Sequence, residues 1–442
     1  MDLSNHALLL HLVLAALLHP AVVVAVDDAT SGRSKGFSLR LVPSPGWNST
    51  IHVDDDGFVH LNEPVEHAPN VLRPHIPHKE RYNIITTVGT GHGCRTYTLA
   101  MEMTQSLTWM QCVPIQNPFE QVPPPFDPTA SPSFHPLAPT NHLCSPPGGI
   151  VCRFRSNPMF LGVASASGVL GHETMSFAAS GHGAAAAVEP AVVIGCAHTS
   201  ERFRSHGVLA GILALGKTYP SLIWLLGRGG LHRFSYCLFF PFTQGNRHGF
   251  LRFGSDIRVD TRHMKSTRLL YPEVSAYYVN LAGISFGRTR LGGNLAEVFR
   301  RRKLADGSWH SGCVLDAGMF WGGTFMIRPA YDILERALAE HGRRLGVPRV
   351  PRHNFGLCFR ATRAILSHWP TVTLHFESEQ DLVLTPNKLF VLQDQDMCLT
   401  VKPHPQITVI GPATQVGTRF VYDLAAGRVY FAPENCNADT GV

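Results

Sequence analysis

The segment Leu99-Ala-Met-Glu-Met-Thr-Gln-Ser-Leu-Thr-Trp109 decides the fold, together with a second segment, Cys313-Val-Leu-Asp-Ala-Gly-Met319. Each is a short apolar run that leads into a turn and carries one carboxylate, Glu102 in the first and Asp316 in the second. A strand followed by a carboxylate-bearing turn therefore occurs twice, far apart in the sequence. The repetition predicts a duplicated architecture with a site on its axis.

Length and composition indicate a globular protein. The chain has 442 residues, of which 44% are hydrophobic and 16% charged, a balance that argues against a disordered chain. This length allows two or more sizeable cores. The net charge is +6 with the histidines neutral, and the 24 histidines would make the protein strongly cationic in an acidic compartment.

The basic residues form no stripe interleaved with aromatic residues, so we expect no nucleic-acid partner. The densest basic run, Arg300-Arg-Arg-Lys303, is interpreted as a solvated loop. A binding patch or a processing site is the alternative for this run.

The first 25 residues resemble a secretory signal peptide. An apolar run from Leu8 to Leu18 is followed by small residues before Val26, which predicts cleavage after Ala25. A transmembrane anchor is the alternative, but two histidines and a proline interrupt the segment, and it is short for a span. The sequon at Asn48 fits the secretory route. We expect a secreted or vacuolar protein that is not held in a membrane after cleavage.

The ten cysteines point to disulfide bonds. None lies in a C-x-x-C pair, so a zinc site is not expected, and a secreted protein usually oxidises its cysteines. Cys144 with Cys152, and Cys358 with Cys398, would close short loops. Cys313 is either a small buried residue or a partner of Cys94, because connectivity cannot be deduced from sequence.

The order of elements predicts a mostly β protein in two lobes. The expected parts are a signal peptide at 1–25, a pro-segment or N-terminal extension at 26–79, an N-terminal β lobe at 80–256 and a C-terminal β lobe at 257–442. Helices are expected at 220–226 and 330–341. Strands are expected at residues 37–42, 82–88, 97–101, 167–177, 191–196, 211–216, 234–238, 277–284, 371–376, 407–411, 421–423 and 428–431.

A weak internal repeat supports the two lobes. In each half an apolar strand ending in glycine follows the carboxylate turn, Leu213-Ala-Leu-Gly216 in the first and Thr408-Val-Ile-Gly411 in the second. Such a strand can pass under the turn and fix the carboxylate.

Several segments together resemble the pepsin-type aspartic peptidases, specifically their plant nepenthesin-like branch, over roughly residues 80–436. The similar pieces, in chain order, are Val88-Gly-Thr90, Ser106-Leu-Thr-Trp-Met-Gln-Cys112, Phe126-Asp-Pro-Thr129, Gly168-Val-Leu-Gly-His-Glu-Thr174, Ile194-Gly-Cys196, Gly211-Ile-Leu-Ala-Leu-Gly216, Phe234-Ser-Tyr-Cys237 and Phe431-Ala-Pro-Glu-Asn-Cys436. The resemblance implies a two-lobed fold with a central cleft that takes a peptide or protein ligand, a monomer, no cofactor and no metal. It also implies a Cys196–Cys436 disulfide.

The chain departs from this family at the catalytic motifs. The first motif of the family is Asp-Thr-Gly-Ser, and this chain has Glu102-Met-Thr-Gln105 at those positions. The second is Asp-Ser-Gly-Thr, and this chain has Asp316-Ala-Gly-Met319. The flap normally contains a Tyr and an Asp, whereas the equivalent positions here begin at Phe160 and contain neither. A cysteine pair of the family is replaced by Ile115 and Pro118.

These departures leave two functions open. Aspartic proteolysis needs two carboxylates that share one proton and hold a water. Glu102 has a longer arm and is expected to have lost both supporting residues, while Asp316 keeps its glycine. The alternative for Glu102 is an ordinary exposed or paired acid. We therefore predict a peptide-binding relative with impaired proteolysis, in an inhibitor- or binding-type role. The alternative is an acid endopeptidase that uses a Glu102/Asp316 pair, and a storage role is a more distant third.

Overall fold

The structure is a computed structural model, and it describes residues 37–43, 51–53, 59–61, 82–156, 165–177, 187–201, 203, 207–238, 249–257, 260–318, 323–352, 355–360, 365, 368–377, 380–393 and 395–436. Residues from Lys35 onward form one compact unit. The predicted signal peptide, the sequon at Asn48 and the flap position Phe160 lie outside the described residues.

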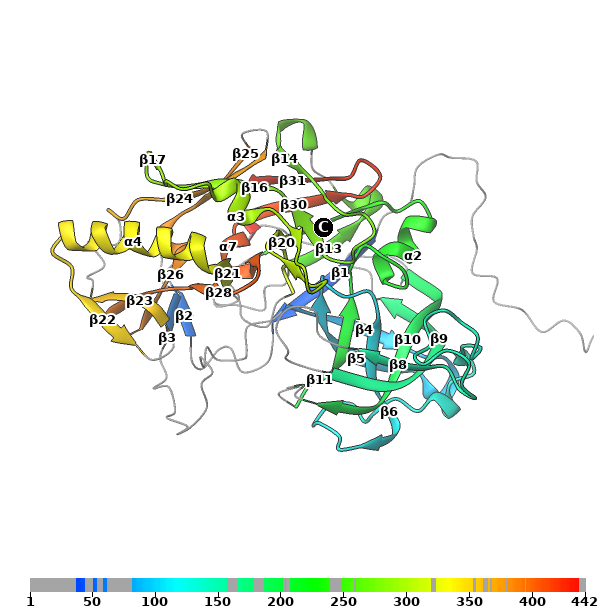
Figure 1. The fold of residues 1–442 in the computed structure, drawn as a ribbon. Helices are drawn as coiled ribbons and strands as arrows, with labels where there is room; N and C mark the ends of the chain where they lie inside the picture. Colours follow the sequence, from blue (N-terminus) through cyan, green and yellow to red (C-terminus); the bar gives the residue numbers. More distant parts are fainter. Residues whose placement is uncertain are drawn as a thin grey trace, which may run out of the picture. The chain divides into compact units, whose positions relative to one another are not determined.

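A 14-stranded sheet organises the first half of the chain (Figure 1). In spatial order its main path is β14 Lys265–Arg268, β31 Arg428–Pro433, β30 Thr418–Asp423, β12 Arg233–Cys237, β13 Gly249–Phe253, β1 Phe37–Pro43, β4 Tyr82–Val88, β5 Arg95–Glu102, β11 Leu209–Ala214, β6 Thr108–Gln116, β10 Ala187–Glu201, β9 Ser165–Phe177 and β7 His135–Pro136. Off this path, β8 Arg153–Ser156 pairs with β9. The closing hairpin β30–β31 thus joins the sheet that carries the first half.

The second half is built from four smaller sheets. A five-stranded sheet contains β15 Tyr277–Val279, β20 Cys313–Leu315, β29 Thr408–Ile410, β21 Thr324–Ile327 and β28 Val401–His404. A four-stranded sheet contains β17 Thr289–Arg290, β16 Leu281–Phe286, β24 Val372–Phe376 and β25 Gln380–Leu384. The others are the pair β18 Arg302–Lys303 and β19 Trp309–His310, and a six-stranded sheet of β2 Ile51–Val53, β3 Val59–Leu61, β26 Phe390–Gln393, β27 Asp396–Leu399, β23 Phe355–Arg360 and β22 Arg349–Arg352.

Helices are short except for one. The described helices are α2 Leu222–Arg228, α3 Leu295–Phe299, α4 Arg328–Arg344, α6 Pro386–Leu389 and α7 Pro412–Gln415, with 3-10 turns η2 Gly91–Gly93, η3 Pro128–Ala130, η4 Gly254–Asp256 and η5 Thr261–His263. The long helix α4 has a proline in its first turn, where the missing N–H costs nothing. It buries Tyr331, Leu334 and Leu338 on one face, which is the spacing of an amphipathic helix.

The internal repeat is confirmed by strand pairing. β11 lies between β5 and β6, parallel to the first and antiparallel to the second. β29 lies in the same way between β20 and β21. In each half, therefore, a later strand separates the two strands that flank the carboxylate turn, and its hydrogen bonds hold both of them.

The N-terminal extension is part of this fold. β1 pairs with β13 on one side and with β4 on the other, so it is an interior strand of the large sheet. β3 pairs with β26 of the six-stranded sheet. The predicted boundaries at residues 80 and 256 are not breaks in strand pairing, and they stay predictions.

Two of the three expected disulfides are present, and the third was wrong. Cys144 is bonded to Cys152 and Cys358 to Cys398. Cys196 is bonded to Cys112, however, because β10 runs parallel to β6 and places the two cysteines side by side, and Cys436 is bonded to Cys237 of β12. Cys94 is exposed and Cys313 buried, and neither is in a disulfide, so they are not partners.

Two other expectations change in detail. The strand expected at 277–284 is two strands, since β15 pairs with β20 and β16 pairs with β24 of a different sheet. The run at 300–303 is not a simple solvated loop, because it contains β18 and the half-buried Arg301. Trp109 is a core residue, with 2% of its surface exposed.

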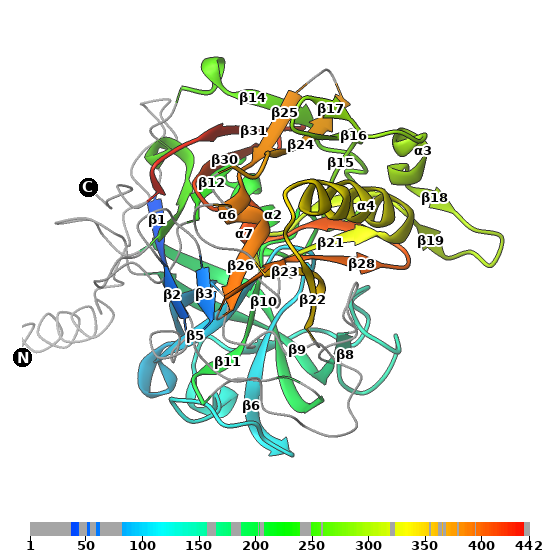
Figure 2. The same ribbon diagram turned by 90° about the vertical axis from the view of Figure 1, so that its left-hand side faces the viewer.

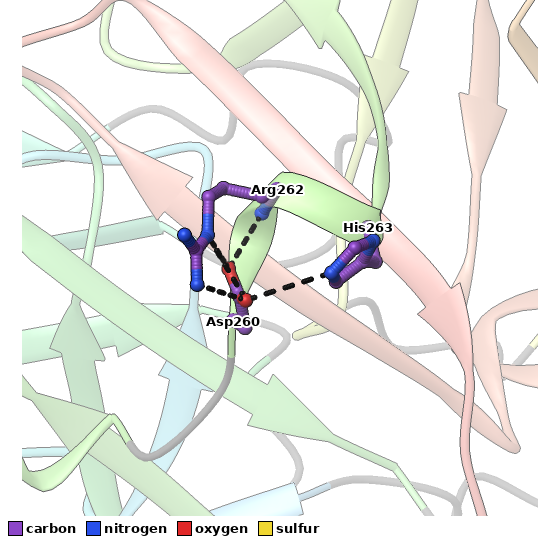
Figure 3. Close-up of polar contacts among 3 residues, drawn as sticks. All are labelled: Asp260, Arg262 and His263. Carbon is purple, nitrogen blue, oxygen red and sulfur yellow. Dashed lines mark hydrogen bonds and ion pairs between the residues drawn. The ribbon is translucent and has the colours of Figure 1, made fainter.

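An exposed ion group marks the start of η5, where the chain approaches β14 (Figure 3). The Asp260 carboxylate accepts the Arg262 backbone N–H at 2.9 Å and also pairs with the Arg262 guanidinium through both oxygens. These bonds lower the pKa of Asp260 to about 2. His263 Nε2 lies 3.8 Å from the same carboxylate. The geometry is that of a helix N-cap, so we assign this group a structural role.

Candidate active site

Glu102 is the last residue of β5 and is almost completely buried, with 9% of its surface exposed. Its backbone carbonyl accepts the Leu215 N–H at 2.7 Å, just beyond the end of β11. Its side-chain Oε1 accepts two hydrogen bonds from Thr104, one from the backbone N–H at 2.9 Å and one from the hydroxyl at 2.6 Å. The Glu102 carboxylate is therefore held on its own turn.

Asp316 follows β20 directly and occupies the equivalent position in the second half. Its backbone N–H donates to the Ile410 carbonyl at 3.1 Å, and its Oδ1 accepts the Gly318 N–H at 2.9 Å. Only 2% of the residue is exposed. Both carboxylates thus accept a backbone N–H from two residues further along the chain, as a repeated strand-to-turn unit requires.

The two turns touch each other. A Cβ added at Gly318 would lie 2.2 Å from the Met101 carbonyl oxygen and 3.1 Å from the Glu102 Cα, so only glycine fits at this position. The Ala317 N–H donates to the Met103 thioether sulfur at 3.3 Å. The structure therefore brings Glu102 and Asp316 into one site, although 214 residues separate them in the sequence.

Burial and a neighbouring charge set the protonation of this site. The pKa of Asp316 is raised well above its usual value, first by burial and second by the negative charge of Glu102. The Gly318 N–H bond opposes this change but does not reverse it. Asp316 therefore holds a proton more tightly than an ordinary aspartate does, next to an acid whose carboxylate is hydrogen-bonded by Thr104.

A cluster of buried tyrosines lies beside Asp316 and was not identified from the sequence. The Tyr236 hydroxyl donates to Gln415 Oε1 at 2.7 Å and lies 2.9 Å from the Tyr422 hydroxyl. Gln415 Nε2 donates to the Ile410 carbonyl, which also accepts the backbone N–H of Asp316. The negative charge of Asp316 contributes to the raised pKa of Tyr422, after burial. The sequence predicted the strands that contain these tyrosines. It did not predict that the tyrosines meet, because their contact depends on pairing between strands that are distant in the sequence.

One expectation about Glu102 was wrong. We expected the change from glycine to Thr104 to remove support from this carboxylate, whereas Thr104 supplies both an N–H and a hydroxyl. The neighbouring Gln105 also has a partner, because its Oε1 accepts the Ser156 hydroxyl at 2.9 Å. Met319 and Phe160 lie outside the described residues, so the flap and the last position of the second motif have no structural account.

Comparisons with known proteins identify the family. A family model described as "Xylanase inhibitor N-terminal" matches residues 84–255, and one described as "Xylanase inhibitor C-terminal" matches residues 276–433. Together they cover most of the chain, and the curated relatives are plant aspartic proteases. The chain belongs to the pepsin-type aspartic peptidase family, in its plant nepenthesin-like branch.

The relatives of this peptidase-family chain have low sequence identity to it but align over most of its length. Aspartyl protease family protein 2 of Arabidopsis thaliana is 28% identical over 361 residues, which cover 79% of this chain and 70% of the relative. Aspartic proteinase nepenthesin-2 of Nepenthes gracilis is 24% identical over 462 residues, covering 96% and 98%. Both names describe the relatives, to which this chain is similar in sequence.

Solved structures show the same fold. The structure titled edgp has a TM-score of 0.66 at 16% identity and covers 93% of this chain and 97% of its own. Basic 7S globulin from soybean has a TM-score of 0.62 at 16% identity and covers 90% and 96%. At this identity they establish the fold, which is the two-lobed, mostly β pepsin-like fold predicted from the sequence.

Proposed function

We propose that this chain is a secreted aspartic-peptidase-like protein whose cleft binds a peptide or protein, with proteolysis impaired or absent. The binding or inhibitory role is supported by the family models, which are described by the name xylanase inhibitor. No partner is specified by the site itself. The impairment is supported by the changed residues that join the two carboxylate turns.

The observation that carries the proposal is the contact between Met103 and Ala317. In the family motif a threonine hydroxyl follows the first acid, and such a hydroxyl can both accept and donate a hydrogen bond. In this chain the Met103 sulfur accepts the Ala317 N–H at 3.3 Å, and a thioether has no proton to donate. The turns remain joined, but the hydroxyl that supports the catalytic network is missing.

The longer side chain of Glu102 adds to this loss. One additional methylene moves the carboxylate by roughly 1.5 Å, whereas catalytic groups must be held within about 0.5 Å of their productive positions. The Thr104 bonds hold Glu102 Oε1 against its own turn, which leaves this oxygen less able to position a water. The shared fold is kept, and the positions needed for chemistry are altered.

The secreted location is part of the proposal. Four disulfides among the described residues fit an oxidising compartment, and the sequence begins with a signal-like segment. Among the residues that the structure describes, no helix is both long enough and apolar enough to cross a membrane.

One observation favours the alternative of an acid endopeptidase. The charge of Glu102 raises the pKa of Asp316, so two carboxylates do share a site in which one proton can be held. If Glu102 reaches a bound water, the pair would cleave slowly at acidic pH. The proposal and the alternative therefore differ in rate, and both use the same fold.

The test is cleavage of a denatured protein substrate by the secreted protein across about pH 3–6, where a carboxylate pair holds one proton. We expect no cleavage above that of the Asp316→Asn variant. Asp332→Asn, at an exposed ion pair on α4, is the matched control for the loss of one carboxylate. Cleavage that is lost in Asp316→Asn, retained in Asp332→Asn and blocked by a transition-state-mimicking peptide would establish the alternative instead.

A further inference from the structure

The hairpin β18–β19 lies at the periphery of the second half (Figure 2). Arg302 pairs with His310 and Lys303 with Trp309. The connecting turn is closed by a hydrogen bond from the Leu304 N–H to the Ser308 carbonyl at 2.7 Å. The Asp306 carboxylate accepts the Ser308 N–H at 2.9 Å and its hydroxyl at 2.6 Å. The short hairpin is therefore well defined for its size.

A single arginine fixes the aromatic residue of this hairpin. The Arg301 guanidinium lies 3.9 Å from the centre of the Trp309 ring, 4.6 Å from that of Tyr271 and 4.8 Å from that of Tyr278. The two tyrosine rings contact each other edge to face at 5.5 Å. Guanidinium groups stack well on aromatic faces. The indole consequently rests on a support of one arginine and two tyrosines.

Trp309 still has 51% of its surface exposed. Because Arg301 covers one face of the ring at 3.9 Å, the exposed half includes the opposite face. A supported indole that presents one face to solvent is a flat, preorganised surface, and such a surface loses little conformational freedom when a ligand stacks on it.

A cation lies beside this exposed ring. Lys303 is the direct cross-strand partner of Trp309, so their Cβ atoms are about 5 Å apart. Lys303 is exposed and, in the described part of the chain, makes no ion pair. Its neighbour Arg302 pairs with His310, on the opposite face of the hairpin. Arg300, in contrast, pairs with Glu297 at 2.8 Å. Asp306, the acid of the hairpin, is hydrogen-bonded within the turn.

We propose that Trp309 and Lys303 form a binding site for an anionic polysaccharide composed of uronic acids. The C–H face of a sugar ring is weakly positive and stacks on the negative face of an indole. A uronate carboxylate on the same or the next sugar would pair with the adjacent ammonium group of Lys303. This site is separate from Glu102 and Asp316 and does not depend on whether the protein cleaves peptides.

A glycan fits these features better than a protein partner does. A stable protein interface buries at least about 600 Å² on each side, with a central apolar cluster. The exposed apolar residues that the structure describes on this hairpin are Leu304, at 37%, and Trp309. One supported ring beside a cation matches a ligand that is a chain of small charged rings.

The experiment measures binding of an oligogalacturonate of about ten units to the full secreted protein, by titration calorimetry and tryptophan fluorescence. Trp309→Ala should weaken binding by at least about tenfold, and Lys303→Gln should also weaken it and reduce its dependence on salt. Arg302→Gln, on the opposite face of the hairpin, should have a smaller effect than Lys303→Gln. Methyl esterification, which removes the charge from the same oligomer, should weaken binding as Lys303→Gln does.

Matched controls separate this site from general attraction of anions to a basic protein. Trp224→Ala removes another tryptophan beside an arginine, Arg228, and Arg343→Gln with Arg344→Gln removes two exposed charges from α4. Neither should change binding. The proposal is overturned if the oligomer does not bind, if Trp309→Ala binds as well as wild type, or if polyglutamate or single-stranded DNA of similar charge binds equally well. Because Trp309 is at the surface, melting temperatures should confirm that its variant is folded.

Discussion

Asp316 is a carboxylic acid that the fold places in a site unsuited to its charged form. Burial and the charge of Glu102 both raise its pKa. Between the unfolded pKa near 4 and the higher folded value, the folded state therefore binds more protons than the unfolded state. It follows that stability from this group is fully present below about pH 4 and is lost as the pH rises through the folded pKa.

Asp316→Asn should consequently stabilise the protein at neutral pH, because the amide cannot ionise. Each unit of pKa shift is worth about 1.4 kcal/mol, which is about 3–6 °C in melting temperature for a domain of 150–250 residues. The difference from wild type should vanish below about pH 4. Melting curves from pH 3 to 8 measure this difference in stability. A variant that is less stable than wild type at every pH would contradict the raised pKa of Asp316.

Met103 offers a second test at the scale of one residue. Met103→Leu conserves volume but leaves the buried Ala317 N–H without its sulfur acceptor, which costs about 1–3 kcal/mol. Met175→Leu is the control, since Met175 is equally buried and, among the described residues, accepts no hydrogen bond at sulfur. We expect Met103→Leu to lower the urea midpoint by more than Met175→Leu does. Equal losses would show that the N–H···S contact contributes nothing.

The sequence revealed the two acids but not how their turns meet. Glu102 and Asp316 could be found because each follows an apolar run and the pattern repeats. The Met103–Ala317 contact joins residues 214 positions apart, and its acceptor is a thioether sulfur where the family motif has a hydroxyl. The role of Thr104 was also missed, because its replacement of the motif glycine was taken as a lost support, whereas Thr104 donates its hydroxyl to Glu102.

At the scale of elements, β1 differs most from its expected role. It was expected as one strand of a loose extension or pro-segment, and it lies between β13 and β4 with Leu39 and Leu41 buried. Alternation of apolar residues predicted the strand itself correctly. Its partners could not be predicted, because both are distant in the sequence and strand order leaves no local signal.

The double variant Leu39→Ala and Leu41→Ala tests whether β1 is an integral strand. Each buried leucine should cost about 2–5 kcal/mol, so the urea midpoint should fall markedly. Val383→Ala, at an exposed position of β25, should have little effect. An unchanged midpoint in the double variant would mean that this segment is a detachable extension.

At the scale of the whole molecule, the disulfides bind distant parts of the chain. The Cys237–Cys436 bond closes a segment of 199 residues and joins β12 to the end of the chain. Loop-closure entropy makes such a bond worth about 2–5 kcal/mol in a chain-entropy model. The short-loop bonds could be predicted from spacing, but Cys112–Cys196 and Cys237–Cys436 follow from strand order, which the family pattern did not supply.

Peptide mapping without reduction tests this connectivity. We expect one linked pair that contains Cys112 and Cys196 and another that contains Cys237 and Cys436. Cys94 should react with an alkylating reagent in the folded protein, whereas the buried Cys313 should react only after unfolding. A peptide that links Cys196 to Cys436 would contradict the strand arrangement around β10.

The central claim is that a pepsin-like site has been kept in shape while its chemistry has been weakened by the residues after Glu102. The most direct measurement is the cleavage rate of wild type and of the triple variant Glu102→Asp, Met103→Thr and Thr104→Gly on one denatured substrate at about pH 4. We predict that wild type is indistinguishable from Asp316→Asn and that the triple variant is at least about tenfold faster. Wild-type cleavage that depends on Asp316 and is not increased in the triple variant would contradict the account.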